Sequence, residues 1–146
     1  MDCSAEKIES RQPGLNLSFP WGMPGLDFKH YTLFSLEADA PFYFLQSADD
    51  PEVGLLLINP FVVFPEYEFD LSEEAVGQLN IKDEKKIAVL CTVNASRGME
   101  SATVNLLAPI VINTEKMMAK QVVLNDRRFS LRTPLKIKRS AEKEEG

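Results

Sequence analysis

The stretch Tyr31-Thr-Leu-Phe-Ser-Leu-Glu37 decides the fold, because its apolar side chains stand among polar ones as in a half-buried strand. A short acidic turn separates it from Phe42-Tyr-Phe-Leu-Gln-Ser47. The continuous apolar run Val53-Gly-Leu-Leu-Leu-Ile58 follows and predicts a strand buried on both sides. Further strands are predicted at residues 87–93, 102–107, 110–112, 120–124 and 128–132. Strands about 10 residues apart, with turn residues between them, predict an antiparallel sandwich or barrel.

The gaps between these runs carry turn residues. In Met23-Pro-Gly-Leu26, Pro and Gly occupy the central positions of a type II turn, where Gly supplies the positive φ. Residues 94–99 are predicted to form a polar hairpin loop, and residues 125–126 a tight hairpin loop.

Only residues 72–79 favour a helix. Ser72 can cap the free N–H groups, and Glu73 and Glu74 stand at the positive end of the helix dipole. Val76 and Leu79 share one face. We therefore expect an all-β, mainly antiparallel, barrel-like fold with one short helix near residues 72–79.

The 146 residues are 45% hydrophobic, which is enough for the core of one domain. We assign that domain to residues 1–135, and we expect the highly charged tail at residues 136–146 to be disordered. No apolar run approaches the ~20 residues of a membrane span, and the polar N-terminus is unlike a signal peptide. Cys3 and Cys91 form no C-x-x-C pair, which favours a reducing, cytoplasmic location.

Charge is distributed unevenly along the chain. The net charge is −6, yet residues 31–81 hold ten acidic residues and no Lys or Arg. Residues 82–146 hold thirteen basic and eight acidic residues. A strongly negative segment repels nucleic acid and anionic lipid and attracts basic partners. We expect no direct binding of nucleic acid or membrane through it.

The sequence offers little for catalysis or metal binding. His30 is the only His, and Cys91 stands in an apolar run typical of a small buried side chain. Zinc and nucleotide motifs are absent, and the acids of Asp49-Asp50-Pro-Glu52 lack the glycine of a calcium loop. We expect no catalytic residues, no metal and no cofactor.

Acidic and apolar residues alternate in Glu66-Tyr-Glu-Phe-Asp-Leu71. On a strand, Glu66, Glu68 and Asp70 would share one face while the apolar residues pack behind them. This face is either an ordinary solvated surface or a docking patch for a basic protein. Paired carboxylates for glycoside hydrolysis need a cleft and two different environments, which adjacent exposed acids do not provide.

The apolar stretch at residues 59–67 precedes these acids. It is either a core strand or part of an exposed hydrophobic patch rimmed by acids, which is how protein-binding sites are built.

Six motifs follow one another along the chain: Phe19-Pro-Trp-Gly-Met-Pro-Gly25, Pro41-Phe-Tyr-Phe-Leu-Gln-Ser47, Asn59-Pro-Phe61, Pro65-Glu-Tyr67, Thr103-Val-Asn-Leu-Leu-Ala-Pro-Ile-Val-Ile-Asn113 and Lys120-Gln-Val-Val-Leu124. In this order they resemble the bacterial flagellar assembly factor FliW family over residues 15–135. Family members usually carry Gly where this chain has Lys120, a difference that we expect to affect only a turn.

The resemblance implies a small, monomeric, cytoplasmic β-barrel protein without enzymatic activity and with two mutually exclusive partners. One is cytoplasmic flagellin. The other is CsrA, a dimeric RNA-binding regulator that represses translation of flagellin mRNA. Released from flagellin, a FliW protein binds CsrA and weakens its hold on RNA.

Because CsrA is basic where it binds RNA, the acidic stretch is the candidate surface for it. We expect Glu66, Glu68, Asp70, Glu73 and Glu74 to face CsrA or its RNA and repel phosphate. The candidate apolar anchors are Phe61, Phe64 and Tyr67.

Other interpretations remain open at this stage. The hairpin loop at residues 94–101, with Arg97 and Met99, is an alternative CsrA site. Alternative functions are a small-molecule-binding β-barrel or a generic protein-interaction module. An enzyme that uses surface carboxylates is disfavoured, because the chain shows no arrangement of base and nucleophile.

Overall fold

The computed structural model describes residues 2–3, 14–26, 28–36 and 41–135; the predicted disordered tail lies outside them. Two 3-10 turns, Glu84–Lys86 and Met99–Ser101, accompany the helices and strands. These elements are β1 (Asp2–Cys3), β2 (Leu15–Ser18), β3 (His30–Ser35), β4 (Phe42–Ser47), β5 (Gly54–Ile58), α1 (Pro60–Val63), β6 (Phe69–Asp70), α2 (Glu73–Gln78), β7 (Ile87–Asn94), β8 (Thr103–Val104), β9 (Ile110–Asn113), β10 (Met118–Gln121) and β11 (Thr133–Pro134).

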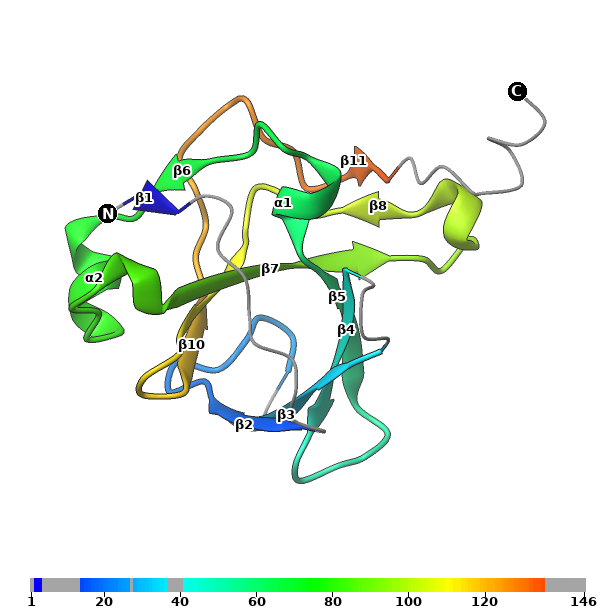
Figure 1. Ribbon diagram of the computed structural model, residues 1–146. Helices are drawn as coiled ribbons and strands as arrows, with labels where there is room; N and C mark the ends of the chain where they lie inside the picture. The colour runs from blue at the N-terminus through cyan, green and yellow to red at the C-terminus, as the bar shows by residue number, and fades with distance from the viewer. Residues whose placement is uncertain (1, 4–13, 27, 37–40, 136–146) are drawn as a thin grey trace.

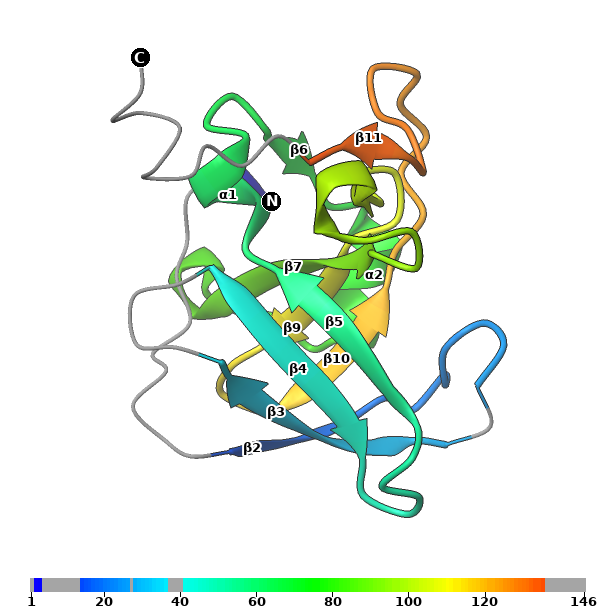
Figure 2. The ribbon, with the colours of Figure 1, turned by 90° about the vertical axis from the view of Figure 1, so that its right-hand side faces the viewer.

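Seven strands close into a barrel in the order β7-β5-β4-β3-β2-β10-β9, and β9 pairs back with β7 (Figure 2). All pairs in this ring are antiparallel except β2–β10, which is parallel and has Ser18 opposite Met118 as its single register pair. The predicted all-β, mainly antiparallel, barrel-like fold is confirmed. None of the helices in the described part of the chain is long and apolar enough to span a membrane.

A smaller layer covers one side of the barrel. Elements α1, β6 and β11 lie on one side of β7, whereas β2, β3 and β4 lie on the other (Figure 1). In this upper layer β6 pairs with β1, and β8 lies between β7 and β11. The upper layer is important because it carries the acidic residues of the candidate site.

Strand β7 separates two hydrophobic cores. Ala88 and Leu90 point into the barrel core, whereas Val89 and Cys91 belong to the core beneath the upper layer. All four side chains are at most 1% exposed. The uninterrupted apolar run of this strand therefore follows from burial on both faces.

The barrel interior is filled by side chains. Its largest buried members include Phe19, Tyr31 and Leu45, each at most 1% exposed, and the rings of Phe19 and Tyr31 meet edge to face at 5.2 Å. A small-molecule-binding barrel would need open space where these rings lie.

Two predicted strands are shorter or displaced, for local reasons. The strand expected at residues 102–107 is limited to β8, because the Asn105 side chain accepts a hydrogen bond from the Ala108 N–H at 2.9 Å and turns the chain. The strand expected at residues 120–124 begins earlier, as β10. Lys120 lies within β10, so the expectation that it affects only a turn was wrong.

The prediction of a strand at residues 128–132 was wrong, and so was the hairpin loop expected at residues 125–126, because β11 pairs with β8 and not with β10. Side chains bind the backbone there: Asp126 accepts from the Arg128 N–H at 3.0 Å, and Ser130 from the Arg132 N–H at 3.1 Å. These local bonds favour turns over a sheet ladder, and β11 begins only after them. The sequence analysis also missed β2.

Residues 59–67 do not form a core strand. The Asn59 side chain accepts a hydrogen bond from the Phe61 N–H at 3.0 Å, and Pro60 occupies the first position of the one-turn helix α1. Both are standard start signals of a helix.

The predicted helix and the predicted type II turn are confirmed. Ser72 caps α2 by accepting from the Ala75 N–H at 3.1 Å. In the turn, the Leu26 N–H donates to the Met23 carbonyl at 3.0 Å, and Gly25 has a φ of 81°. The polar hairpin loop after residue 94 joins β7 to β8 as expected.

Candidate functional site

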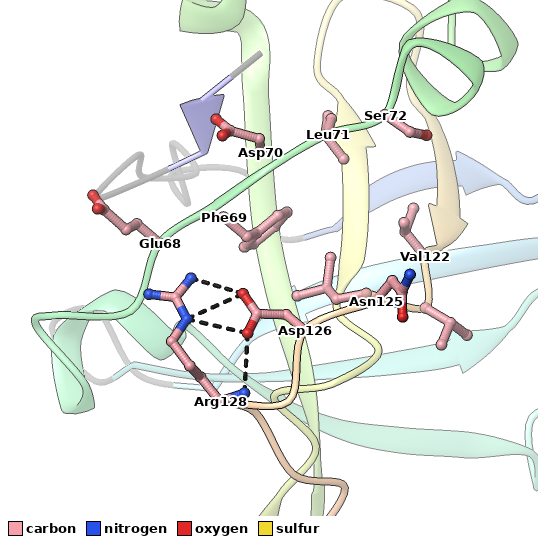
Figure 3. Close-up of a pocket in the computed structure, with 11 residues that line it drawn as sticks. Glu68, Phe69, Asp70, Leu71, Ser72, Val122, Asn125, Asp126 and Arg128 are labelled. Atoms are coloured by element: carbon pink, nitrogen blue, oxygen red, sulfur yellow. Dashed lines mark hydrogen bonds and ion pairs between the residues drawn. The ribbon is translucent and has the colours of Figure 1, made fainter.

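The segment at residues 66–74, which contains β6 and the start of α2, carries five exposed carboxylates. We call Glu66, Glu68, Asp70, Glu73 and Glu74 the acidic ridge. The residues between the first three acids are buried, so the predicted alternation is confirmed although only Phe69 and Asp70 belong to a strand. Figure 3 shows the carboxylates of Glu68 and Asp70 pointing away from the Phe69 ring. The two remaining acids lie in the first turn of α2, where the helix dipole favours negative charge.

Beside the ridge lies a groove of about 500 Å³, lined by residues 68–72 on one side and residues 122–126 and 128 on the other (Figure 3). Its apolar lining includes Phe69, Leu71 and Leu124, which are at most 8% exposed. Two segments far apart in the sequence therefore build one hollow with a partly apolar surface and an acidic rim.

Among the described residues that line this groove, Arg128 is the one cation. Its guanidinium binds Asp126, with Nη2 at 2.7 Å from Oδ2 and Nε at 3.1 Å from both oxygens. This hydrogen bond lowers the pKa of the Asp126 carboxyl and raises the pKa of Arg128. Glu68 and Asp70 form no ion pair with any described residue. The groove therefore keeps an excess of negative charge.

The predicted aromatic anchors lie deeper than expected. Tyr67 is 3% exposed and its hydroxyl donates to the Leu106 carbonyl, so the expectation of an exposed anchor is corrected for this residue. Phe61 packs against the Tyr67 ring with centroids 5.7 Å apart, and both Phe61 and Phe64 are half-buried. These two side chains keep a partial surface for a partner.

Sequence reasoning missed the most exposed apolar residues of this region. Val62 in α1 is 55% exposed, and Val123 on the groove is 72% exposed. Both stand in apolar runs that favour strands, and nothing in those runs identifies the residue that faces solvent. It also missed Asp126 and Arg128, whose approach to the ridge depends on the tertiary fold.

The alternative site at the 94–101 loop is a separate hollow of about 280 Å³. Arg97 lines it together with Arg132 from the turn before β11, and Met99 nearby is 40% exposed. This second surface is polar and basic, opposite in charge to the acidic ridge.

The described residues assemble no metal centre. Cys91 is buried, as predicted, and burial raises the pKa of its thiol to about 12, which suppresses the reactive thiolate. His30 is exposed at the start of β3. No three His, Cys, Asp or Glu side chains gather within the described ranges in a way that could hold a metal ion.

Comparison with known proteins identifies the family. The family model described as FliW protein matches residues 3–135. The chain belongs to the FliW family. The FliW protein of Bacillus subtilis strain 168, a flagellar assembly factor, is 37% identical over 118 residues, which are 80% of this chain and 82% of that relative. The FliW protein of Caldicellulosiruptor bescii is 39% identical over 114 residues, which are 78% of this chain and 75% of the relative.

A solved FliW structure has the same fold. The crystal structure of a flagellar assembly factor FliW aligns with this FliW-family chain at a TM-score of 0.76 and 36% sequence identity. The alignment covers 91% of both chains, so it includes the barrel and the upper layer together.

Proposed function

We propose that this FliW-family protein is a cytoplasmic, non-catalytic flagellar assembly factor that binds flagellin and CsrA in turn. Free of flagellin, it binds CsrA and weakens the repression of flagellin mRNA translation. Family membership supports the assembly role, since its relatives are flagellar assembly factors. The observation that carries the CsrA part is the acidic ridge, whose Glu68 and Asp70 form no ion pair with any described residue.

The proposed mechanism is electrostatic. CsrA must be basic where it binds RNA, because neutralising phosphates dominates such affinity. A ridge of five exposed carboxylates is attracted to that basic surface. Once docked, it repels phosphate over about one Debye length, roughly 8 Å at physiological salt. The affinity of CsrA for RNA is therefore lowered although the RNA site is not covered. The coupling is reciprocal, so bound RNA equally lowers the affinity of CsrA for this protein.

The half-buried rings of Phe61 and Phe64 lie in the segment that precedes the ridge. Their exposed portions can supply apolar contact area, while the carboxylates set orientation and association rate. In this arrangement affinity depends on the rings and salt dependence depends on the ridge.

The test is a triple charge reversal of the ridge, Glu66→Lys, Glu68→Lys and Asp70→Lys. Loss of three exposed charge pairs at about 0.5 kcal/mol each predicts at least roughly a tenfold loss of CsrA affinity at low salt, and repulsion by the introduced lysines adds to it. A flatter salt dependence and weaker displacement of RNA should accompany this loss. Affinity is measured by calorimetry across a salt series, and displacement by RNA fluorescence anisotropy.

A matched control reverses three exposed acids outside the ridge, Asp49→Lys, Glu52→Lys and Glu115→Lys. This variant has the same net charge as the ridge variant and should retain CsrA binding. If both triple variants lose CsrA affinity equally, net charge alone accounts for the interaction. If both bind CsrA as tightly as the wild type, the ridge is not the site. Competition between flagellin and CsrA for the wild-type protein tests whether the two partners exclude each other.

A further inference from the structure

One edge of the segment at residues 122–125 is paired and the other is open. The Val122 N–H donates to the Pro109 carbonyl at 2.9 Å, and the Leu124 N–H donates to the Leu107 carbonyl at 2.8 Å. The two bonds advance by two residues on each chain, which is the spacing of extended backbone. Residues 122–124 therefore run antiparallel to residues 107–109.

Alternation in extended backbone turns the intervening groups the other way. The N–H and C=O of Val123 and the N–H of Asn125 consequently point away from residues 107–109, on the side of the segment that borders the groove. In the described part of the chain these three groups have no hydrogen-bond partner. An unpaired row of this kind is a template for an added strand.

The side chains around this edge define what could add to it. Phe69 and Leu124 provide an apolar surface in the groove. The opposite wall carries Glu68 and Asp70, whereas Arg128 is held by Asp126 (Figure 3). Val123 is 72% exposed, so apolar contact is available on the solvent side as well. The acidic wall favours a basic chain segment, and the unpaired backbone edge favours a segment in extended conformation.

We propose that the groove binds an extended basic segment of a partner protein, which adds as a strand to the open edge at Val123–Asn125. Alternate side chains of the segment contact Phe69 and Leu124, and its Lys or Arg residues pair with Glu68 and Asp70. This proposal deepens the proposed function: it rests on the same acidic surface and specifies how a basic partner engages it. A helix docked in the groove would leave the open edge unpaired.

The first experiment uses a capped peptide, Lys-Val-Lys-Val-Lys-Thr, as the probe. With the full-length ¹⁵N-labelled protein, binding should slow hydrogen exchange at the Val123 and Asn125 amides by about tenfold at a peptide concentration roughly ten times the Kd. A peptide of the same composition in block order, Lys-Lys-Lys-Val-Val-Thr, is the control for charge alone. If both peptides bind equally without protecting these amides, charge attraction accounts for binding and strand addition is overturned.

The second experiment removes one donor without changing a side chain. An amide-to-ester replacement at Val123 deletes an N–H that has no intramolecular partner, so the Tm should stay nearly constant. Peptide affinity should fall by a factor of about two to ten, the value of one hydrogen bond. The matched ester at Leu124 deletes a bond to Leu107 and should lower the Tm while sparing peptide affinity. Equal peptide affinity of the wild type and the Val123 ester overturns the proposal.

The two proposals fail in different ways. If the ridge reversal abolishes CsrA binding while the Val123 ester leaves peptide binding intact, the CsrA proposal stands and strand addition is wrong. If the peptide binds with amide protection while CsrA does not bind at all, strand addition stands and the CsrA proposal is wrong.

Discussion

The hydroxyl of Tyr67 donates a hydrogen bond to the carbonyl oxygen of Leu106 at 2.7 Å, and both residues are at most 6% exposed. The bond joins the segment of the acidic ridge to the chain that follows β8. The Tyr67 ring also meets Phe69 at 5.5 Å and Phe129 at 4.9 Å between centroids. Tyr67 therefore ties the segment of the acidic ridge to the chain after β8 and to Phe129.

Tyr67→Phe should lower the free energy of unfolding by about 1–2 kcal/mol, because it leaves the buried Leu106 carbonyl without its donor. Tyr67→Ala should cost about 3–5 kcal/mol, because it also empties the ring's volume. Urea denaturation gives both values. Equal stability of wild type and Tyr67→Phe would mean that the carbonyl finds another donor.

The thiol of Cys91 should make stability fall in alkaline solution. Its pKa is raised from 9.0 to about 12 by burial, so between these values the unfolded chain releases a proton that the folded chain retains. The free energy of unfolding should then decrease by up to about 1.4 kcal/mol per pH unit above pH 9. Cys91→Ala is less stable overall but lacks this dependence, so its difference from wild type should shrink as pH rises. Parallel pH profiles of the two proteins would contradict the assignment.

Lys120 links two parts of the molecule that are distant in sequence. Its ammonium donates to the Gln78 side chain of α2 and lies 5.2 Å from the centroid of the Trp21 ring. A double-mutant cycle with Lys120→Met and Trp21→Leu should give a coupling energy of about 0.5–1 kcal/mol, as expected for a cation on a half-exposed ring. Trp21 is the single Trp, so Lys120→Met should also change the fluorescence emission. A coupling energy of zero would show that the contact between Lys120 and Trp21 contributes nothing to stability.

Arg128→Gln should strengthen binding of a basic partner. The substitution removes the cation that the described residues bring to the groove, and it leaves Asp126 unneutralised beside Glu68 and Asp70. Affinity for the alternating lysine peptide should rise about two- to threefold at low salt, with a steeper salt dependence. Because Arg128 is exposed, the Tm should change little. Lower affinity would indicate that Arg128 contacts the partner directly.

Strands of the barrel could be predicted from the sequence where the residue pattern is compatible with only one structure. The strand predicted at residues 42–47 coincides with β4, and the apolar run predicted at residues 87–93 is β7 with one further residue. The apolar run of β7 is continuous because both faces of the strand are buried. The strand could therefore be predicted without deciding which of its residues face the core. The helix α2 was predictable because Ser72 and the acids after it provide local start signals.

Other features needed contacts that no local pattern contains. The alternation in residues 66–71 placed Tyr67 behind the acids, whereas its choice as a partner anchor was wrong, because nothing near it indicates that its hydroxyl meets Leu106, 39 residues away. The groove has the same origin, since its walls come from residues 68–72 and 122–126. The one-turn helix α1 is different: Asn59 followed by Pro60 is a local start signal that was available and was outweighed by the surrounding apolar residues.

The parallel contact between β2 and β10 has a kinetic consequence. Every other neighbouring pair in the ring is antiparallel, whereas this one joins Ser18 to Met118 across most of the chain. Bringing such distant residues together costs the most loop entropy of any step in closing the ring. We therefore expect the hairpins at β3, β4 and β5 to form early and the ring to close last between β2 and β10. By the same argument, we expect the native barrel to open first between these two strands, with the upper layer still attached to β7.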